Sequence, residues 1–461
     1  MVFANPFSGR VRSVRTAGSK LLFMDLESGG RVIQIVCQLK ALEEQDSGIT
    51  PETFRAFRKI ARKGDHYTVS GYPHCTQSGE SSILANALPE LLSPSLHQIP
   101  ESLQDPEARA RFRHVDMLVN EEAIHTLRVR HHVETSMQAF FNDKGFVKVT
   151  TPILGAGAGG ATARPFETEA TELAEQKLNL RIAPELWLKR LIVGGMDTVY
   201  EMGPAFRNEG VDATHNPEFN ICEFYQAYAT LEQLMNTTVQ IFRDLKYRFN
   251  NTATLTELPK DVAMLEKDFE QVEFIPALQE HLGRALPDLE KPDAHNVILE
   301  IFQEKGISIP ANPTLPRLLD ELAAQYLEPL SHEHPVFITN HPACMSPLSK
   351  HFTCSQTGQT VAARAELFIQ GREYANMYEE ENSPFEQRRK FEEQLKQRET
   401  DKEAMELDEN YLQALEWGLP PTGGWGCGMD RLVMLFSGRE RMADVLAFGS
   451  LRNVVGLGRQ R

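Results

Sequence analysis

The chain has 461 residues, of which 41% are apolar and 24% are charged, a balance typical of a globular protein with two or three domains. Its formal charge of −16 taken alone argues against a polyanionic partner, although a local basic groove can sit on an acidic protein. No apolar run reaches the roughly 18 residues that a membrane span needs, so we expect no membrane partner.

Cysteine usage and the N-terminal charges bear on the compartment. The cysteines stand at positions 37, 75, 222, 344, 354 and 427 without a CxxC pair, which is typical of reduced, mostly buried thiols in an intracellular protein. The first 24 residues carry basic side chains and no acidic one, as the end of an organellar transit peptide does. Val11, Val14 and Leu22 favour strands of a first domain instead, and no clear cleavable presequence is visible.

Residues 8–95 have the pattern of a small all-β domain. The stretch SKLLFMDLESGGRVIQIVC contains two β-rich runs joined by Ser28-Gly29-Gly30, which is a hairpin signal. Several short strands with glycine turns predict a small barrel. Residues 96–127 are punctuated by proline and then become charged and helical, which is typical of a linker.

A helix followed by a strand is expected next. The segment 128–144 has apolar residues at helical spacing, and Gly145 ends that helix. The run FVKVTTP predicts a strand that ends at Pro152. Residues 198–230 have the pattern of a β-hairpin with a long polar loop.

The rest of the chain alternates between helices and strands. Helical periodicity covers 231–248 and most of 263–330, and strands return from residue 335. A charged helix is expected at 383–400, followed by a glycine-rich strand that runs into a last helix. Strands joined by hairpins, with helices inserted between them, indicate an antiparallel α+β domain.

The first group of candidate site residues lies in FRNEG (206–210) and EFNICEFYQ (218–226). Side chains alternate along a strand, so Phe219, Glu223 and Tyr225 share a face with Ile221. An aromatic ring, a carboxylate and a phenol form a poor core but a good pocket for an adenine ring and an amine. Arg207 at the strand end could bind a phosphate bidentately. The alternative is an ion-paired sheet face.

The second group lies in RAELFIQGREYANMYEEEN (364–382), where alternation places Asn376, Tyr378 and Glu380 on one face. Glu366 lies on the preceding strand, and Glu373 is out of phase with Glu380, so it needs a strand end or a bulge to share the site. Neighbouring carboxylates repel each other unless cations pair with them, and Mg²⁺ carried by ATP or a substrate ammonium would serve. The alternative is a solvated acidic hairpin.

The third group lies in PPTGGWGCGMDRLVMLF (420–436). Its glycines allow another molecule to approach the backbone closely. We expect Asp430 to cap the following helix and Arg431 to lie in its first turn. A positive side chain at the positive end of a helix is locally unfavourable, and that conflict indicates an anion site.

Three blocks resemble motifs 1, 2 and 3 of the class II aminoacyl-tRNA synthetases: the helix and strand ending at Pro152, the FRNEG hairpin, and GMDR before an apolar helix. Within that class the chain resembles the lysyl-tRNA synthetase family over nearly its whole length. The segments that carry this resemblance are GGATARPF (159–166), RIAPELWLKRLIVGG (181–195), HNPEF (215–219), MSPLSK (345–350) and LEWGLPPTGGWGCGMDRLVMLF (415–436). The segments NSPFEQR (382–388) and FGSLRNVV (448–455) are most similar to fungal organellar members.

The resemblance implies an α+β protein with an N-terminal OB-fold β-barrel and a class II catalytic domain, whose antiparallel sheet is flanked by helices. We expect the anticodon-binding OB-fold at 1–100, a linker at 101–127 and the catalytic domain at 128–461. A helical insertion without chemistry of its own is expected at about 250–334. The resemblance also implies a homodimer, formed through the motif 1 helix with its apolar stripe.

The resemblance assigns roles to individual residues. Arg207 matches the arginine on the ATP α-phosphate and Arg431 the one on the γ-phosphate, and both are the expected catalytic residues. Glu209 and His215 match neighbours of the nucleotide, Phe219 the ring under adenine, and Glu366 and Glu373 the carboxylates that hold Mg²⁺. The lysine pocket is matched by Gly160, Glu185, Glu223, Tyr225, Asn376, Tyr378 and Glu380, and the residues that read the anticodon by Phe23, Gln34 and Glu80.

The implied activity is the ATP-dependent formation of lysyl-adenylate and the transfer of lysine to the 3′ end of tRNA(Lys). Glu380 and Glu185 could each bind either ammonium of lysine, and the resemblance assigns Glu380 to the side chain. Met377 replaces a smaller residue of the family, which predicts a narrower site. Rival functions are an aspartyl or asparaginyl synthetase and a catalytically dead paralogue that binds tRNA or protein. The fungal likeness implies the mitochondrial matrix, with the cytoplasm as the alternative.

Overall fold

The computed structural model describes residues 6–45, 48–76, 79–157, 159–160, 163–173, 176–210, 212, 215–252, 258–310, 312–398 and 407–457. Ala161 and Thr162 of the GGATARPF segment, and residues 211, 213 and 214 of the hairpin loop, lie outside those ranges. The chain divides into two compact units, Met1–Gln104 with His114–Asn120, and Asp105–Arg113 with Glu121–Arg461. No helix within the described ranges is both long enough and apolar enough to span a membrane.

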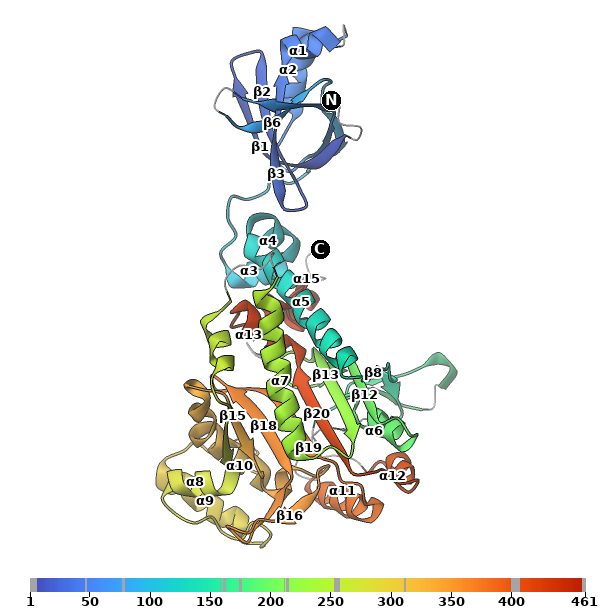
Figure 1. Cartoon of the computed structure of the whole chain (residues 1–461), viewed down its shortest axis with the longest axis vertical. Coiled ribbons are helices and arrows are strands. Elements are labelled where there is room, and N and C mark those ends of the chain that lie inside the picture. Colours follow the sequence, from blue (N-terminus) through green and yellow to red (C-terminus); the bar gives the residue numbers. More distant parts are fainter. Residues whose placement is uncertain are drawn as a thin grey trace. The chain divides into compact units, whose positions relative to one another are not determined.

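The first unit is an OB-like β-barrel, which confirms the predicted fold. Its sheet has the strand order β5-β6-β3-β2-β1-β4-β7 (Figure 1). The strands are β1 (Phe7–Ala17), β2 (Leu21–Ser28), β3 (Arg31–Gln38), β4 (His66–Val69), β5 (Gly71–Cys75), β6 (Ser81–Ala85) and β7 (Glu90–Ser93), and the helices are α1 (Leu39–Gln45) and α2 (Pro51–Ile60).

The β2–β3 hairpin has the predicted turn. Ser28 pairs with Arg31, and both glycines between them have positive φ angles, which glycine adopts without a Cβ clash. Alternation along β2 buries Leu22, Met24 and Leu26 in the barrel core. The side chains between them, including Phe23, therefore belong to the opposite face of the strand.

The second unit is built on a mixed sheet of eight strands in the order β14-β15-β18-β19-β20-β13-β12-β8, and it is mostly antiparallel, as predicted. Only the outer pairs β14–β15 and β12–β8 are parallel among the described strands. The strands are β8 (Val147–Lys148), β12 (Thr198–Phe206), β13 (Glu218–Ala227), β14 (Glu270–Glu273), β15 (Val336–Thr339), β18 (Arg364–Ile369), β19 (Arg372–Glu379) and β20 (Thr422–Gly428).

Three helices cover one face of this sheet (Figure 1). They are α5 (Glu121–Asp143), α7 (Leu231–Asn250) and α13 (Met429–Ser437), and their apolar side chains share a core with β13, β19 and β20. A capping box between Thr230 and Gln233 begins α7. The opposite face of the sheet is left for polar chemistry.

Two groups of helices flank that polar face. The helices α8 (Phe274–Leu282), α9 (Ala294–Lys305) and α10 (Leu315–Tyr326) share a hydrophobic core with residues of β15 and β18. A further cluster joins α6 (Glu185–Val193), α11 (Pro384–Arg398) and α12 (Glu409–Leu415). The other described elements are α3 (Pro106–Arg111), α4 (Arg113–Val119), α14 (Met442–Val445), α15 (Leu451–Leu457), β9 (Leu154–Gly155), β10 (Glu167–Thr168), β11 (Leu178–Leu180), β16 (His351–Thr353) and β17 (Thr360–Ala362).

Several local predictions were wrong. The strand expected to reach Pro152 ends at Lys148, and two short helices follow the one that was expected to be last. The apolar stripe of α5, which includes Val133 and Met137, is buried in the unit's own core. Met377 also points into that core, where its sulfur accepts a hydrogen bond from Thr238, so it does not narrow the site.

Candidate active site

A cavity of about 700 Å³ opens on the polar face of the eight-stranded sheet. Its size is that of a small-molecule or cofactor site. The predicted site residues that line it are Gly160, Glu185, Arg207, Glu209, His215, Phe219, Glu223, Tyr225, Glu366, Glu373, Asn376, Tyr378 and Arg431. Glu380 is the exception among the predicted residues of this unit, because it is fully buried behind the cavity wall.

Strand β13 presents the expected face. Phe219, Ile221, Glu223 and Tyr225 all line the cavity, as the alternation predicts. Arg207 follows the end of β12, where its guanidinium lies 5.1 Å from the centre of the Phe219 ring. A cation over a ring face is held in place by the ring's quadrupole, which leaves the N–H groups of Arg207 able to bind an anion.

The β18–β19 hairpin brings its two carboxylates to the cavity. Glu366 lies opposite Asn376, and a shift of register after Leu367 pairs Phe368 with Glu373. This irregularity is the bulge that Glu373 needs in order to share the site with the alternating residues of β19. The structure therefore confirms both the hairpin and the expected break in its alternation.

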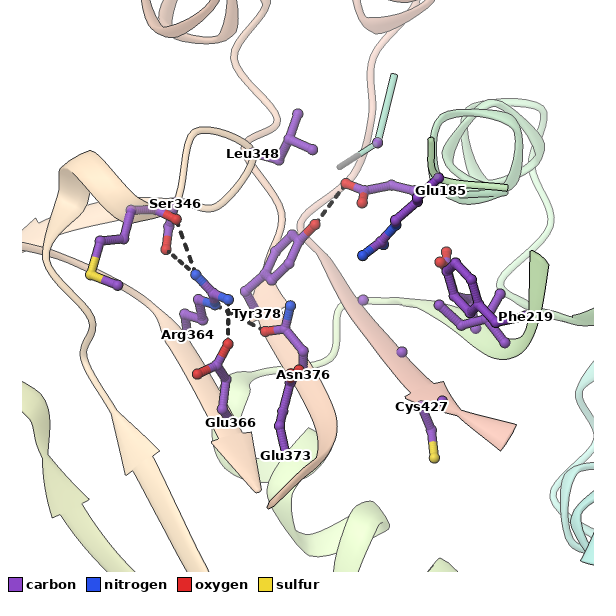
Figure 2. A pocket seen from close by; sticks show the side chains of 18 of the residues that line it. Glu185, Phe219, Ser346, Leu348, Arg364, Glu366, Glu373, Asn376, Tyr378 and Cys427 are labelled. Carbon is purple, nitrogen blue, oxygen red and sulfur yellow. Dashed lines mark hydrogen bonds and ion pairs between the residues drawn. The ribbon is translucent and has the colours of Figure 1, made fainter. Parts of the chain in front are cut away.

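Glu366 is held in a charged network that Figure 2 shows. Arg364 pairs with Glu366 Oε1, and His341 Nε2 lies 3.0 Å from Oε2. Burial would raise the pKa of Glu366, but Arg364 and His341 lower it to about 2. Arg364 also donates to Asn376 Oδ1 (3.0 Å) and Ser346 Oγ (3.1 Å), so it fixes several walls of the cavity at once.

Arg431 contacts Glu373, the second of the two carboxylates of this hairpin. Its Nη1 donates to the backbone oxygen of Glu373 (3.0 Å), and its Nη2 lies 3.3 Å from His215 Nε2. Asp430 does not cap α13 as predicted: it is buried, pairs with Arg130 and accepts a hydrogen bond from the backbone of Asn220 (2.8 Å). This network fixes the start of α13 and with it the position of Arg431.

Three buried acids surround the deep end of the cavity. Glu185 Oε1 accepts hydrogen bonds from Tyr378 Oη (2.7 Å) and Lys189 Nζ (2.6 Å). Glu223 accepts one from Tyr225 Oη (3.2 Å). Burial and the charge of Glu185 raise the pKa of Glu223 to about 8, so the free protein holds a proton there at neutral pH. A cationic ligand would favour the ionised form.

Two glycines of β20 are required by packing inside the protein, and two others leave open space in the cavity. A Cβ at Gly423 would lie 3.0 Å from Leu234, and one at Gly424 would lie 1.9 Å from Glu380 Oε1. Gly426 and Gly428 line the cavity without any contact that short. The prediction of close approach by another molecule therefore applies to these last two, whereas the neighbours of Gly423 and Gly424 already exclude a side chain.

Some residues in or behind the cavity wall were not predicted. Arg364 stands two positions before Glu366 on one strand, so alternation places both on the same face. Lys189 stands four positions after Glu185 on α6, which is the spacing of neighbours on a helix surface. The insertion also reaches the cavity through Arg317 and Asp320, contrary to the expectation that it carries no chemistry. Burial and the charge of Glu366 raise the pKa of Asp320 to about 6.

A metal ion bound in the cavity would need coordinating atoms from a ligand in addition to those of the protein. Within the described residues, no group of three or more His, Cys, Asp or Glu side chains could hold a metal ion. Glu366 and Glu373 nevertheless both line the cavity. Mg²⁺ is usually held by one or two carboxylates together with substrate phosphates and water, so this pair fits Mg²⁺ in the company of a nucleotide.

The three predicted residues of the barrel form a group of their own. Gln34 Nε2 donates to Glu80 Oε2 (2.9 Å), and Gln34 lies opposite Asp25, two positions along β2 from Phe23. Cross-strand partners share a face, so Phe23 and Gln34 lie on the same side of the sheet. Gln34 is buried, and its Oε1 has no hydrogen-bond partner within the part of the chain that the structure describes.

Comparison with known proteins gives a consistent result. A family model described as tRNA synthetases class II (D, K and N) matches residues 105–452. The chain is 42% identical to the mitochondrial lysine–tRNA ligase of Schizosaccharomyces pombe, over 97% of this chain and 84% of that one. It is 37% identical to lysine–tRNA ligase cla4 of Cladosporium cladosporioides (97% and 75% covered) and 36% identical to a probable cytoplasmic lysine–tRNA ligase of Encephalitozoon cuniculi (96% and 87% covered).

Proposed function

Since the chain belongs to the class II tRNA synthetases of the D, K and N group, we propose that it is a lysine–tRNA ligase. It activates lysine with ATP and transfers it to the 3′ end of tRNA(Lys). The observation that carries the choice of lysine is the set of acids at the deep end of the cavity, Glu185, Glu223 and Glu380. An aspartate carboxylate would meet repulsion there, and asparagine would bring no positive charge to these acids.

Nucleotide binding is proposed for the opposite end of the cavity. Phe219 offers a ring face to adenine, while Glu209 and His215 line the wall beside it. Arg207 and Arg431 bind the α- and γ-phosphates, because planar guanidinium groups match phosphate oxygens. Glu366 and Glu373 would hold Mg²⁺, which neutralises charge on the phosphates when it is bound.

The reaction needs positioning and charge neutralisation rather than a covalent intermediate on the protein. A carboxylate oxygen of lysine attacks the α-phosphorus, a new C–O–P linkage forms, and the bond to the leaving pyrophosphate breaks. Arg207 and Arg431 stabilise the negative charge that develops on the phosphate oxygens. In the second step the tRNA 3′-terminal hydroxyl attacks the lysyl carbonyl, and AMP leaves.

The direct test of the whole function is lysine acceptance by tRNA. Purified protein is incubated with ATP, Mg²⁺, total tRNA and labelled lysine, and acid-insoluble label is measured over time. We expect label to accumulate with lysine and to remain at background with labelled aspartate or asparagine. Charging with aspartate or asparagine, or with no amino acid tested, would contradict the proposal.

We propose that the barrel binds the anticodon through Phe23, Gln34 and Glu80. Phe23 offers a ring face for stacking on the side of the sheet that Gln34 shares. Phe23→Ala is expected to weaken tRNA charging by about 1–3 kcal/mol, since one base stack is lost. Pyrophosphate exchange should be unchanged, because adenylate formation needs no anticodon.

A control is Ile60→Ala, which removes an exposed apolar side chain from the same unit. It should leave tRNA charging within about twofold of wild type, as surface substitutions usually do. Equal losses of Phe23→Ala in charging and in pyrophosphate exchange would indicate a folding defect and would contradict the anticodon role.

We propose that the chain assembles as a homodimer through the motif 1 region. The apolar stripe of α5 is used inside the unit, but Val147, Ile153 and Leu154 in the following segment are exposed. Light scattering at micromolar concentration should give about twice the chain mass of 52.0 kDa. Leu154→Glu should shift the mass toward a single chain by placing a charge in the interface. A wild-type mass near that of one chain would contradict the proposal.

The mitochondrial matrix is the proposed compartment. The support is the likeness to a mitochondrial relative at 42% identity, set against a cytoplasmic relative at 36%. Subcellular fractionation with an antibody against the protein should place it with matrix markers. Recovery with cytosolic markers alone would contradict the assignment and leave the enzymatic proposal intact.

A further inference from the structure

Lys189 occupies an unusual place beside the amino-acid end of the cavity. It lies on α6, is fully buried, and its Nζ is 2.6 Å from Glu185 Oε1 and 2.5 Å from Glu380 Oε2. The rings of Tyr378 and Tyr411 lie 5.8 Å and 5.6 Å from the same Nζ. Burying a charged lysine is costly, and two carboxylates with two ring faces are what compensates it here.

The two oxygens of Glu380 have different surroundings. Among the described residues neither oxygen has a hydrogen bond of regular geometry, but Oε2 forms an ion pair with Lys189 Nζ, whereas Oε1 has no ion pair. A Cβ built at Gly424 would lie 1.9 Å from Oε1, so this oxygen sits on the side of β20 to which position 424 points. Gly424 lines the cavity, so Oε1 lies directly behind this part of the cavity wall.

We propose that Lys189 is a positioning residue that selects the substrate's side chain: it holds Glu380 Oε2 and leaves Oε1 alone to accept the ammonium of the incoming lysine. The proposal rests on the proposed function, which supplies lysine as the substrate. A single presented oxygen suits an ammonium, which binds as a compact point charge. It does not suit the guanidinium of arginine, which binds carboxylates best through two parallel hydrogen bonds.

The ionisable groups around Lys189 and Glu380 determine whether each of these two side chains is charged. Burial would lower the pKa of Lys189, but Glu185 and Glu380 raise it well above its ordinary value, so its ammonium stays charged. The titratable groups that face the pair are Glu185 on α6, Tyr411 on α12, Tyr378 on β19, and Glu223 and Tyr225 on β13. No other cation among these faces Glu380, so loss of Lys189 would favour a neutral Glu380 carboxyl.

The primary test compares Lys189→Met with the matched control Lys390→Met. Lys390 is also buried and pairs with the next acid in the chain, Glu381, at 2.6 Å, but it does not line the cavity. In pyrophosphate exchange we expect Lys189→Met to raise the KM for lysine by about 100-fold and to leave the KM for ATP unchanged, since one partner of a buried charge pair is removed. The control should change neither KM by more than a few-fold.

Two further measurements distinguish a role of Lys189 in selecting the substrate from a purely structural role. The preference for lysine over arginine, measured as the ratio of kcat/KM values at a pH where Glu380 is ionised, should fall roughly tenfold in Lys189→Met because both carboxylate oxygens are then available. Burial already raises the pKa of Glu380, and loss of Lys189 would raise it further, so the elevated KM for lysine should decline as the pH rises and Glu380 regains its charge, as long as the substrate's ε-ammonium, with a pKa near 10.4, stays protonated. The wild type measured at the same pH values is the reference.

A double variant keeps the proposal testable even where Lys189→Met alone fails to fold. Lys189→Met combined with Glu380→Gln removes both charges, and its KM for lysine should equal that of Glu380→Gln within a few-fold, without the pH-dependent recovery. A large additional loss in the double variant, or parallel losses for lysine, arginine and ATP in the single one, would overturn the proposal. Failure of the wild type to use lysine at all would instead refute the proposed function.

Discussion

Arg207→Ala is expected to slow lysine-dependent pyrophosphate exchange by about 3–4 kcal/mol in kcat, by analogy with the removal of one preorganised donor from an oxyanion site. The guanidinium is held over Phe219 at 5.1 Å and lines the cavity, so it is in place before the substrate arrives. The positive charge of Arg207 acts on the α-phosphate, whose geometry changes during the reaction. The KM for lysine should change much less than kcat.

The control for this prediction is Arg388→Ala, because Arg388 pairs with Glu409 at the surface of the same unit. Exposed ion pairs contribute little, so exchange by this variant should be within about twofold of wild type. Arg207→Lys keeps a charge but loses the planar fork, and it should recover only part of the activity. Full activity in Arg207→Ala would remove this residue from the mechanism.

Glu380→Gln is expected to lower kcat/KM for lysine by roughly 2–5 kcal/mol, because a charge-assisted hydrogen bond in a desolvated site is lost while the shape of the side chain is kept. Glu380 is fully buried, and its Oε1 lies against Gly424, a residue of the cavity wall. The KM for ATP should hardly change, since Arg207 and Arg431 bind the nucleotide at a distance from this acid.

The matched control is Glu381→Gln, the neighbouring buried acid whose partner is Lys390. It keeps side-chain volume and removes one buried charge, but the Glu381 carboxylate binds Lys390 Nζ (2.6 Å) and the backbone N–H of Ser383 (3.0 Å) and not Lys189. Its kcat/KM for lysine should stay within a few-fold of wild type. If Glu380→Gln retained full activity with lysine, the assignment of Glu380 would be wrong even though the enzyme class would stand.

Strand periodicity was the most informative part of the sequence. Alternation correctly placed Phe219, Glu223 and Tyr225 on one face, and the phase mismatch of Glu373 correctly demanded a bulge. Glu380 lies one residue past the end of β19, where an isolated bridge pairs it with Ser349, and its side chain is buried behind the cavity wall instead of lining the cavity. Local patterns are informative within a regular strand and lose their meaning where the strand ends.

Other features depend on contacts between distant segments, which no local pattern contains. Asp430 has the residue type of a helix cap, but Arg130, three hundred positions earlier, pairs with it instead. The pairing of Lys189 with Glu380 likewise joins α6 to the end of β19. The stripe on α5 was visible in the sequence, but whether it packs against the same chain or another is decided by the tertiary fold.

The most direct test of the central claim is the amino-acid dependence of pyrophosphate exchange by the unmodified protein. Lysine, arginine, ornithine, aspartate and asparagine are each supplied with ATP, Mg²⁺ and labelled pyrophosphate, and the label that enters ATP is measured. A cavity that ends in three buried acids predicts rapid exchange with lysine, weaker exchange with ornithine and arginine, and none with aspartate or asparagine. Exchange that is fastest with aspartate or asparagine, or absent with lysine, would contradict the account.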